Sequence, residues 1–277
     1  MLRFLVVVDG IDKVRAFSKL ITPLCEFNPR GNVVITLRED VMIVYRPPDS
    51  VRTTSMFQLN VHPNEAFSTY LFEYDDGEEI AFEVSAEQLG NLFGQHANDT
   101  EKLSITLNMV GETPFLHVET EPQDKDDNLN IVFQQESEFR SLVAPETAGD
   151  SLHVTFPEPG KLQSVLNSIR YMDFTKVELI GDTKGIVKLK AAGEQAQVEV
   201  GIRDLPVEIK SDDETVEIED GEPMSATVEV RALVNFIRIT GAANHCMKIV
   251  FNHRTALRAI VEQTEGFLTL YLPHIGL

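Results

Sequence analysis

The segment Phe82-Glu-Val-Ser-Ala86 has a counterpart 146 residues later, Val228-Glu-Val-Arg-Ala232. In both segments apolar and polar residues alternate, which is the pattern of a strand with one buried face. A stretch with the apolar spacing of a helix follows each of them. A strand that leads directly into a helix at two distant points of one chain indicates an internal duplication.

Three further pairs of segments follow one another in the same order in the two halves of the chain. Their separations decrease from 148 to 139 residues, but the order does not change. We therefore expect two copies of one module, and chance similarity is the alternative. The pairs are Lys13-Val14, Phe17 and Ile21 with Lys161-Leu162, Val165 and Ile169; Leu103, Ile105, Leu107 and Asn108 with Met247, Ile249, Phe251 and Asn252; and Leu129-Asn-Ile-Val-Phe133 with Leu268-Thr-Leu-Tyr-Leu272.

Four stretches have the apolar period of helices that lie flat against a sheet. They span about residues 10–25, 85–97, 159–171 and 231–243. Between them, short alternating runs are separated by turn residues such as Asp75-Asp-Gly77 and Gly181-Asp182, a pattern typical of antiparallel hairpins. The sequence predicts an α+β chain, and each half has the order strand, helix, three or four strands, helix, three strands.

The two halves are joined by a polar stretch with proline, glycine and weak periodicity, which indicates a crossing linker. We expect a first domain at 1–136, the linker at 137–150 and a second domain at 151–277. Two acidic segments, Glu121 to Asp127 and Ser211 to Glu222, contain too little apolar surface to order themselves. We predict that both are mobile loops.

The chain is strongly acidic, with 44 acidic residues, 24 basic residues and a formal net charge of −20 over 277 residues. Such a chain repels nucleic acid unless basic residues gather on one surface. The four predicted helices carry a summed charge of +5. Solubilising side chains are the alternative at any single position. The residues that we expect to face DNA are Lys13, Arg15, Lys19, Lys161, Arg170, Arg231 and Arg238.

The common motifs of enzymes and metal sites are absent from the sequence. There is no phosphate-cradling glycine-rich loop, no His-Glu-x-x-His motif and no Gly-x-Ser-x-Gly elbow. Cys25 and Cys246 are too few for a zinc cluster or a disulfide framework, and we predict reduced thiols in an intracellular protein. We therefore expect no catalysis, no cofactor and no metal site. We also expect no contact with a membrane, since no stretch approaches the roughly 20 apolar residues of a span.

Three short segments carry a resemblance to a known family. The chain begins with a strand that closes on an Asp-Gly turn, Phe4-Leu-Val-Val-Val-Asp9-Gly10. A basic-Asp-Leu segment, Arg203-Asp204-Leu205-Pro206, precedes a variable loop, and the last strand runs into an aromatic residue and a proline at Leu270-Tyr-Leu-Pro273. These segments resemble the Hus family of the DNA-damage checkpoint clamp, and the order of elements is similar to that of sliding clamps along nearly the whole chain.

The resemblance implies two tandem copies of the sliding-clamp domain, with antiparallel sheets outside and four helices on the inner face. It implies a heterotrimeric ring with two related clamp subunits, which a clamp loader places around double-stranded DNA at damage sites. The ring would support checkpoint signalling and recruit repair enzymes, in the nucleus or also in the cytoplasm. A homotrimeric replication clamp, a β-rich enzyme with a cryptic site and a protein-only scaffold are the alternatives.

Subunits of such rings join through edge strands, so that main-chain hydrogen bonds extend a sheet from one subunit to the next. The candidate edges are the last strand of the first half and a strand in the middle of the second half. For both, an interior strand is the alternative. The predicted interface residues are Asn130, Ile131, Val132, Phe133, Val198, Val200 and Ile202.

Overall fold

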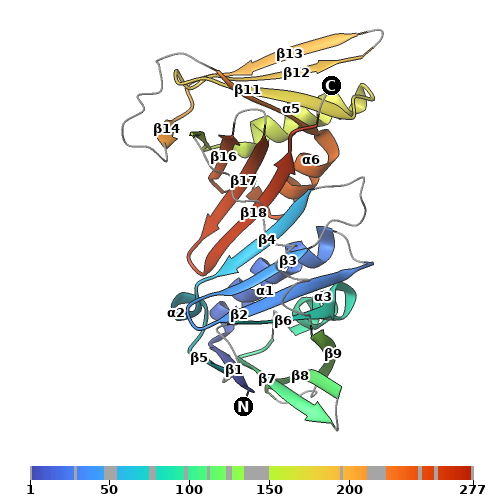
Figure 1. Ribbon diagram of the computed structural model, residues 1–277, viewed down its shortest axis with the longest axis vertical. Helices are drawn as coiled ribbons and strands as arrows, with labels where there is room; N and C mark the ends of the chain where they lie inside the picture. The colour runs from blue at the N-terminus through green and yellow to red at the C-terminus, as the bar shows by residue number, and fades with distance from the viewer. Residues whose placement is uncertain are drawn as a thin grey trace. The chain divides into compact units, whose positions relative to one another are not determined.

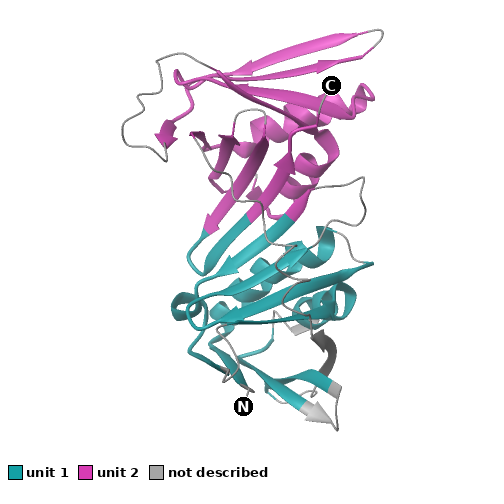
Figure 2. Ribbon diagram, viewed as in Figure 1, with its two compact units in different colours: residues 1–49, 57–143, 263–268 teal, residues 50–56, 144–262, 269–277 magenta. Residues whose placement is uncertain are grey.

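The chain divides into two compact units (Figures 1 and 2). The first comprises residues 1–49, 57–143 and 263–268, and the second comprises residues 50–56, 144–262 and 269–277. Both units combine helices with antiparallel strands. The computed structural model describes residues 2–27, 30–46, 55–74, 79–96, 99–110, 113–122, 127–133, 150–193, 196–210, 223–242, 245–252 and 255–275.

In the first unit, the strands follow the hydrogen-bonded order β5-β1-β7-β8-β9-β6-β2-β3-β4, and neighbours are antiparallel. The helices are α1 (Ile11–Phe27), the single turn α2 (Pro63–Ala66) and α3 (Ala86–His96). The strands are β1 (Leu2–Asp9), β2 (Asn32–Arg38), β3 (Met42–Arg46), β4 (Met56–Val61), β5 (Thr69–Tyr74), β6 (Glu79–Ser85), β7 (Lys102–Val110), β8 (Thr113–Glu121) and β9 (Asp127–Phe133).

In the second unit, the strands form two rows, β14-β10-β16-β17-β18 and β13-β12-β11-β15. The helices are α5 (Pro159–Tyr171) and α6 (Val230–Ile239). The strands are β10 (Ser151–Phe156), β11 (Lys176–Gly181), β12 (Val187–Ala192), β13 (Gln197–Ile202), β14 (Val207–Lys210), β15 (Met224–Glu229), β16 (Met247–Asn252), β17 (Ala256–Gln263) and β18 (Gly266–Pro273), and the last of these begins among residues of the first unit.

The two units share one topology. The row β5-β1-β7-β8-β9 corresponds to β14-β10-β16-β17-β18, and β4-β3-β2-β6 corresponds to β13-β12-β11-β15. The helices α1 and α5 follow the first strand of each unit, and α3 and α6 follow β6 and β15 directly. The α+β fold and the internal duplication predicted from the sequence are therefore confirmed. The predicted order is corrected in one respect, because each unit has five strands between its two long helices and not three or four.

In each unit, two helices pack against each other, α1 against α3 and α5 against α6. The α5 helix buries Leu162, Leu166 and Ile169, which recur at helical spacing on one face. In the first unit the buried Phe17 of α1 makes edge-to-face contacts with Phe67 and Phe93, with ring centroids 5.1 and 5.3 Å away. Burial of one apolar face per helix leaves the opposite face to polar residues.

Two of the three segments that carried the family resemblance have special backbone geometry. Gly10 has a φ of 103° at the end of β1, a conformation that favours glycine. Asp204 has a φ of 61°, and the N–H of the next residue, Leu205, donates to the carbonyl of Gly185 over 3.0 Å. A Cβ at Gly185 would lie 2.3 Å from the Leu205 carbonyl oxygen, so a close backbone approach fixes this connection.

Several sequence predictions concern residues outside the described ranges. They are the Asp75-Asp-Gly77 turn, the linker at 137–150 apart from Asp150, the acidic segment from Ser211 to Glu222, and the centre of the acidic segment at 123–126. The domain boundaries drawn from that linker stay a prediction. None of the helices within the described ranges is long and apolar enough to cross a membrane.

Candidate nucleic-acid interface

A polar groove of about 380 Å³ lies between α5 and α6 of the second unit. The lining positions recur at i, i+4, i+7 and i+8 on α5 and at i, i+3, i+4 and i+7 on α6, so one face of each helix borders the groove. Its described lining includes three arginines and no carboxylate. The lining residues are Gln163, Asn167, Arg170, Tyr171, Arg231, Val234, Asn235 and Arg238.

The three arginines of the groove are exposed, and two of them are positioned by neighbours on their own helices. The Nη2 of Arg238 donates to the Oδ1 of Asn235 over 2.8 Å. The guanidinium carbon of Arg170 lies 5.5 Å from the centroid of the Tyr171 ring, within the range of a cation–π contact. A guanidinium group offers five N–H donors in a planar fork that matches a phosphate group. The groove can therefore bind anions that carry several oxygens.

Three of the seven basic residues predicted to face DNA come together in this groove, and Lys161 does not. Lys161 lies in the first turn of α5, where its Nζ is 2.7 Å from the Oε2 of Glu158. Both side chains of this ion pair are mostly exposed, so it adds little to stability. The amide and phenol side chains of the groove, at positions 163, 167, 171 and 235, were not predicted. The sequence signal that could have predicted them is their position at helical intervals from the arginines, which places them on the same helix faces.

The helix pair of the first unit has a different surface. Lys13 and Lys19 of α1 are exposed, and Arg15 Nη1 lies 3.7 Å from Asp12 Oδ1. The α3 helix has Glu87 in its first turn and contains neither lysine nor arginine. The predicted basic residues of the first half therefore lie on α1 alone.

The observed helix bounds correct the predicted charge. The α1 helix continues to Phe27 and so includes Glu26, which lies beyond the predicted end at residue 25. The summed charge of the four helices is therefore +4 and not +5. The pair α1 and α3 has no net charge, and the pair α5 and α6 carries all of it.

The strand β13 ends its row in the second unit. Val198, Val200 and Ile202 pair with residues of β12, and no strand in the described part of the chain pairs with the other edge of β13. These three side chains are half-buried, and the residues between them are exposed. The second of the two predicted edges is therefore a sheet edge, and its role as a subunit interface stays a prediction.

The strand β9 is not a free edge over its whole length. Asn130 pairs with Phe115 of β8, whereas Ile131, Val132 and Phe133 pair with β6. The reason is that β9 continues past its pairing with β8 and reaches β6 of the same unit. The expected edge at Ile131–Phe133 is thus hydrogen-bonded within the chain, unlike that of β13.

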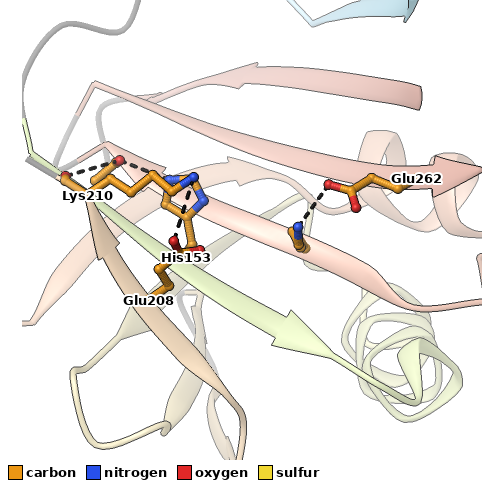
Figure 3. A network of polar contacts seen from close by, with 6 residues as sticks. His153, Glu208, Lys210 and Glu262 are labelled. Atoms are coloured by element: carbon orange, nitrogen blue, oxygen red, sulfur yellow. Dashed lines mark hydrogen bonds and ion pairs between the residues drawn. The ribbon is translucent and has the colours of Figure 1, made fainter. Parts of the chain in front are cut away.

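A network of polar contacts lies on β10, β14, β16 and β17 (Figure 3). His153 Nε2 and Ser151 Oγ are 3.1 Å apart, and burial, followed by the nearby Lys210, lowers the pKa of His153. The imidazole is therefore neutral at neutral pH, as expected of a structural histidine. Among the described residues, no group of three His, Cys, Asp or Glu side chains is arranged to hold a metal ion. The other contacts are the ion pairs Lys210–Glu208 and Lys248–Glu262.

The two copies of one topology, each with a packed helix pair, define the sliding-clamp fold. The structure is similar to the crystal structure of proliferating cellular nuclear antigen (PCNA) from Entamoeba histolytica, with a TM-score of 0.71, 13% identity and complete coverage of both chains. It is also similar to PCNA from Thermococcus kodakaraensis, with a TM-score of 0.67 and 15% identity over 98% of this chain and 100% of that chain. No curated protein matches the sequence.

At these identities, the structural similarity shows the fold and leaves the branch open. The branch follows from the sequence, because the family model described as Hus1-like protein matches residues 3–276. The chain belongs to the Hus1-like family. The resemblance seen in the three short segments is therefore confirmed.

Proposed function

We propose that the chain is one subunit of a heterotrimeric ring clamp that encircles double-stranded DNA at damage sites. The ring supports checkpoint signalling and recruits repair enzymes, and this subunit acts by binding and not by catalysis. The observation that carries the proposal is the match to the Hus1-like family along nearly the whole chain, together with the sliding-clamp fold. The proposal includes a clamp loader as a partner and a nuclear location.

The distribution of charge supports DNA as the ligand. The chain has a net charge of −20, yet α5 and α6 carry only basic charges, and the described lining of the groove between them contains no carboxylate. An acidic protein with one basic surface attracts a polyanion there and repels it elsewhere. Contacts to phosphates need no reading of bases and therefore permit sliding along the duplex.

The sheet edge at β13 is where we propose that one related subunit binds. Its exposed N–H and C=O groups can pair with an edge strand of the partner, and Val198, Val200 and Ile202 can pack against that partner's side chains. The second related subunit would bind at β9, through Asn130, Ile131, Val132 and Phe133. There a partner strand would replace the short pairing with β6.

The stoichiometry of the purified protein tests this proposal. The full chain is measured by size-exclusion chromatography with light scattering, alone and together with the two related subunits. We expect a monomer alone and a one-to-one-to-one complex in the mixture. A homotrimer formed by the chain alone would contradict the proposal and favour a replication clamp.

Substitutions in β13 test the interface separately from the fold. Val198→Asp with Val200→Asp places two charges on the half-buried face of the edge strand, and we expect the ternary complex to be lost. Gln197→Asp with Gly201→Asp is the matched control, because both positions are exposed on the same strand. Equal loss of assembly with both pairs of substitutions would count against pairing through this face.

Retention on closed DNA tests whether the ring encircles the duplex. The complex is loaded by its clamp loader on a gapped circular DNA, and the DNA is then linearised. A ring that encircles DNA stays on the circle and slides off the free ends. Equal retention on circular and linear DNA would indicate surface binding and would overturn the proposal.

A further inference from the structure

We propose that the groove between α5 and α6 is the principal DNA backbone contact of this chain, and that the α1–α3 pair contributes little. The duplex then touches the subunit through its second unit, with Arg170, Arg231 and Arg238 bound to phosphates. This inference rests on the proposed function, because it assigns the DNA contact of the same ring to particular residues.

The two helix pairs differ in charge and in the shape of their surfaces. Both pairs occupy the same place in one topology, but α5 and α6 carry +4 and α1 and α3 carry no net charge. The three arginines gather in one groove with amide side chains of Gln163, Asn167 and Asn235. Amide N–H groups add neutral hydrogen-bond donors beside the guanidinium groups, as a phosphate contact requires.

Arg231 occupies a position that is unfavourable for a cation. It lies in the first turn of α6, where the helix dipole places positive partial charge and disfavours a cation. The first turn of α3 contains Glu87 instead, the residue type that a helix N-terminus favours. The helix dipole therefore gives Arg231 no stabilising role, and we attribute its presence to an anion bound in the groove.

The arginine-lined face of α6 extends over two helical turns. Arg231 and Arg238 are seven residues apart on α6, so they lie on one face and about 10.5 Å apart along the axis. Two guanidinium groups that start this far apart on one helix face can contact different phosphates of the DNA backbone.

The α3 helix shows what the first unit lacks. The groove-lining positions of α6 lie three, four and seven residues after Arg231. The same intervals counted from Glu87 of α3 reach Gly90, Asn91 and Gly94, and none of these residues is basic. Gly94 is exposed and a Cβ there would have no atom within 4 Å, so a side chain can extend from this position into solvent. Glu87 is also exposed. Arginine at these two positions would reproduce the pair Arg231 and Arg238 on the neutral helix.

The test compares two triple substitutions that change the charge of the loaded ring equally. With Arg170→Glu, Arg231→Glu and Arg238→Glu, we expect retention on circular DNA to fall about tenfold or more, and the slope of log affinity against log salt to decrease by about 2. With Lys13→Glu, Arg15→Glu and Lys19→Glu, we expect less than about a threefold loss and a change in slope below about 1. Equal losses would overturn the proposal.

Two further variants separate DNA binding from folding. Glu87→Arg with Gly94→Arg should raise retention about threefold or more, because it adds the missing basic residues to α3. Arg231→Glu alone should weaken DNA binding with an unchanged or higher Tm, since it removes an unfavourable charge from a helix N-terminus. A lower Tm for Arg231→Glu, or no gain from the α3 variant, would contradict the assignment.

Failure of this inference can be distinguished from failure of the proposed function. Light scattering on the same samples reports whether the ring forms. If it does not form, titration of the full chain with a short duplex at low salt still compares the two triple variants. If both triple variants assemble into rings and are retained equally on DNA, the proposed function stands and the principal role of the groove is overturned.

Discussion

The helix pairs of the two units have the same place in the topology but differ in net charge. The α1–α3 pair combines three basic residues with three acidic ones, whereas α5 and α6 have no acidic residue at all. Both pairs bury apolar side chains, such as Phe17 of α1 and Phe236 of α6, because packing constrains the core. The comparison shows that duplication preserved the buried faces, and that the exposed faces diverged where packing places no demand on them.

The sheet edges also differ between the units. In the first unit β9 reaches β6, whereas in the second unit the corresponding strands, β18 and β15, belong to separate rows. The β13 edge is open in the described part of the chain. Two copies of one module therefore present different surfaces to partners.

The largest expected effect tests whether the units are separate in stability. Phe17→Ala removes a buried ring that contacts Phe67 and Phe93, and we expect a loss of about 3–5 kcal/mol in the free energy of unfolding. Urea unfolding measures the loss, and native-state amide exchange locates it. Protection should fall in the first unit and persist in the second. Equal loss in both units would indicate one cooperative structure.

Alkaline pH should lower the stability of the first unit more than that of the second. Burial raises the pKa of Cys25 and that of Tyr45 to about 12, and it raises the pKa of Tyr70, all in the first unit. In the second unit burial raises the pKa of Tyr271. Groups that stay protonated when folded contribute stability below their unfolded pKa values of about 9 to 10, and this contribution is lost as pH rises toward 12.

The first unit should therefore lose stability first above pH 9. Each such group contributes a decrease of about 1.4 kcal/mol per pH unit between its unfolded and folded pKa values. Urea unfolding between pH 8 and pH 11, followed by amide exchange in each unit, measures this. Cys25→Ala should reduce the slope between pH 9 and pH 11. An unchanged slope would show that the buried thiol does not cause the effect.

Backbone conformation gives a pair of smaller, opposite effects. Gly10 has a φ of 103°, so Gly10→Ala should lower stability by about 1–2 kcal/mol. Asp173 has a φ of 64° after the last turn of α5, so Asp173→Gly should raise stability by about 1 kcal/mol. Thermal unfolding measures both. A decrease in Tm for Asp173→Gly would show that its side chain has a stabilising role.

The smallest effect sharpens the comparison of α3 with α6. Gly94→Ala should stabilise α3 by about 0.5–1 kcal/mol, because alanine has a higher helix propensity and the site has room for its Cβ. Retention on DNA should not change, since no charge is added. A gain in retention with alanine would show that helix stability, and not charge, accounts for any gain with Gly94→Arg.

Much of the fold followed from local pattern. The apolar period placed the predicted helix at 159–171 on the observed range Pro159–Tyr171, because its buried residues have strict helical spacing. The helix predicted at 231–243 ends at Ile239, and Thr240 forms its C-cap. The short helix Pro63–Ala66 was missed, because a single turn is too short to show a period.

The candidate site was predicted only in part. The basic residues of α5 and α6 were visible as sequence, but which of them share a groove depends on the packing of one helix against the other. Lys161 was grouped with Arg170 because both lie on α5, and the structure pairs it with Glu158 instead. Strand pairing likewise separated β13, which ends its row, from β9, which reaches β6.

The sequence by itself determined the duplication, the element types and the family, because periodicity and short motifs are local properties of the chain. Only the tertiary structure decided which polar side chains converge between α5 and α6 and which strand keeps an open edge. The physical reason is that side-chain spacing along an element determines its faces, whereas the partner of each face depends on contacts between residues far apart in sequence.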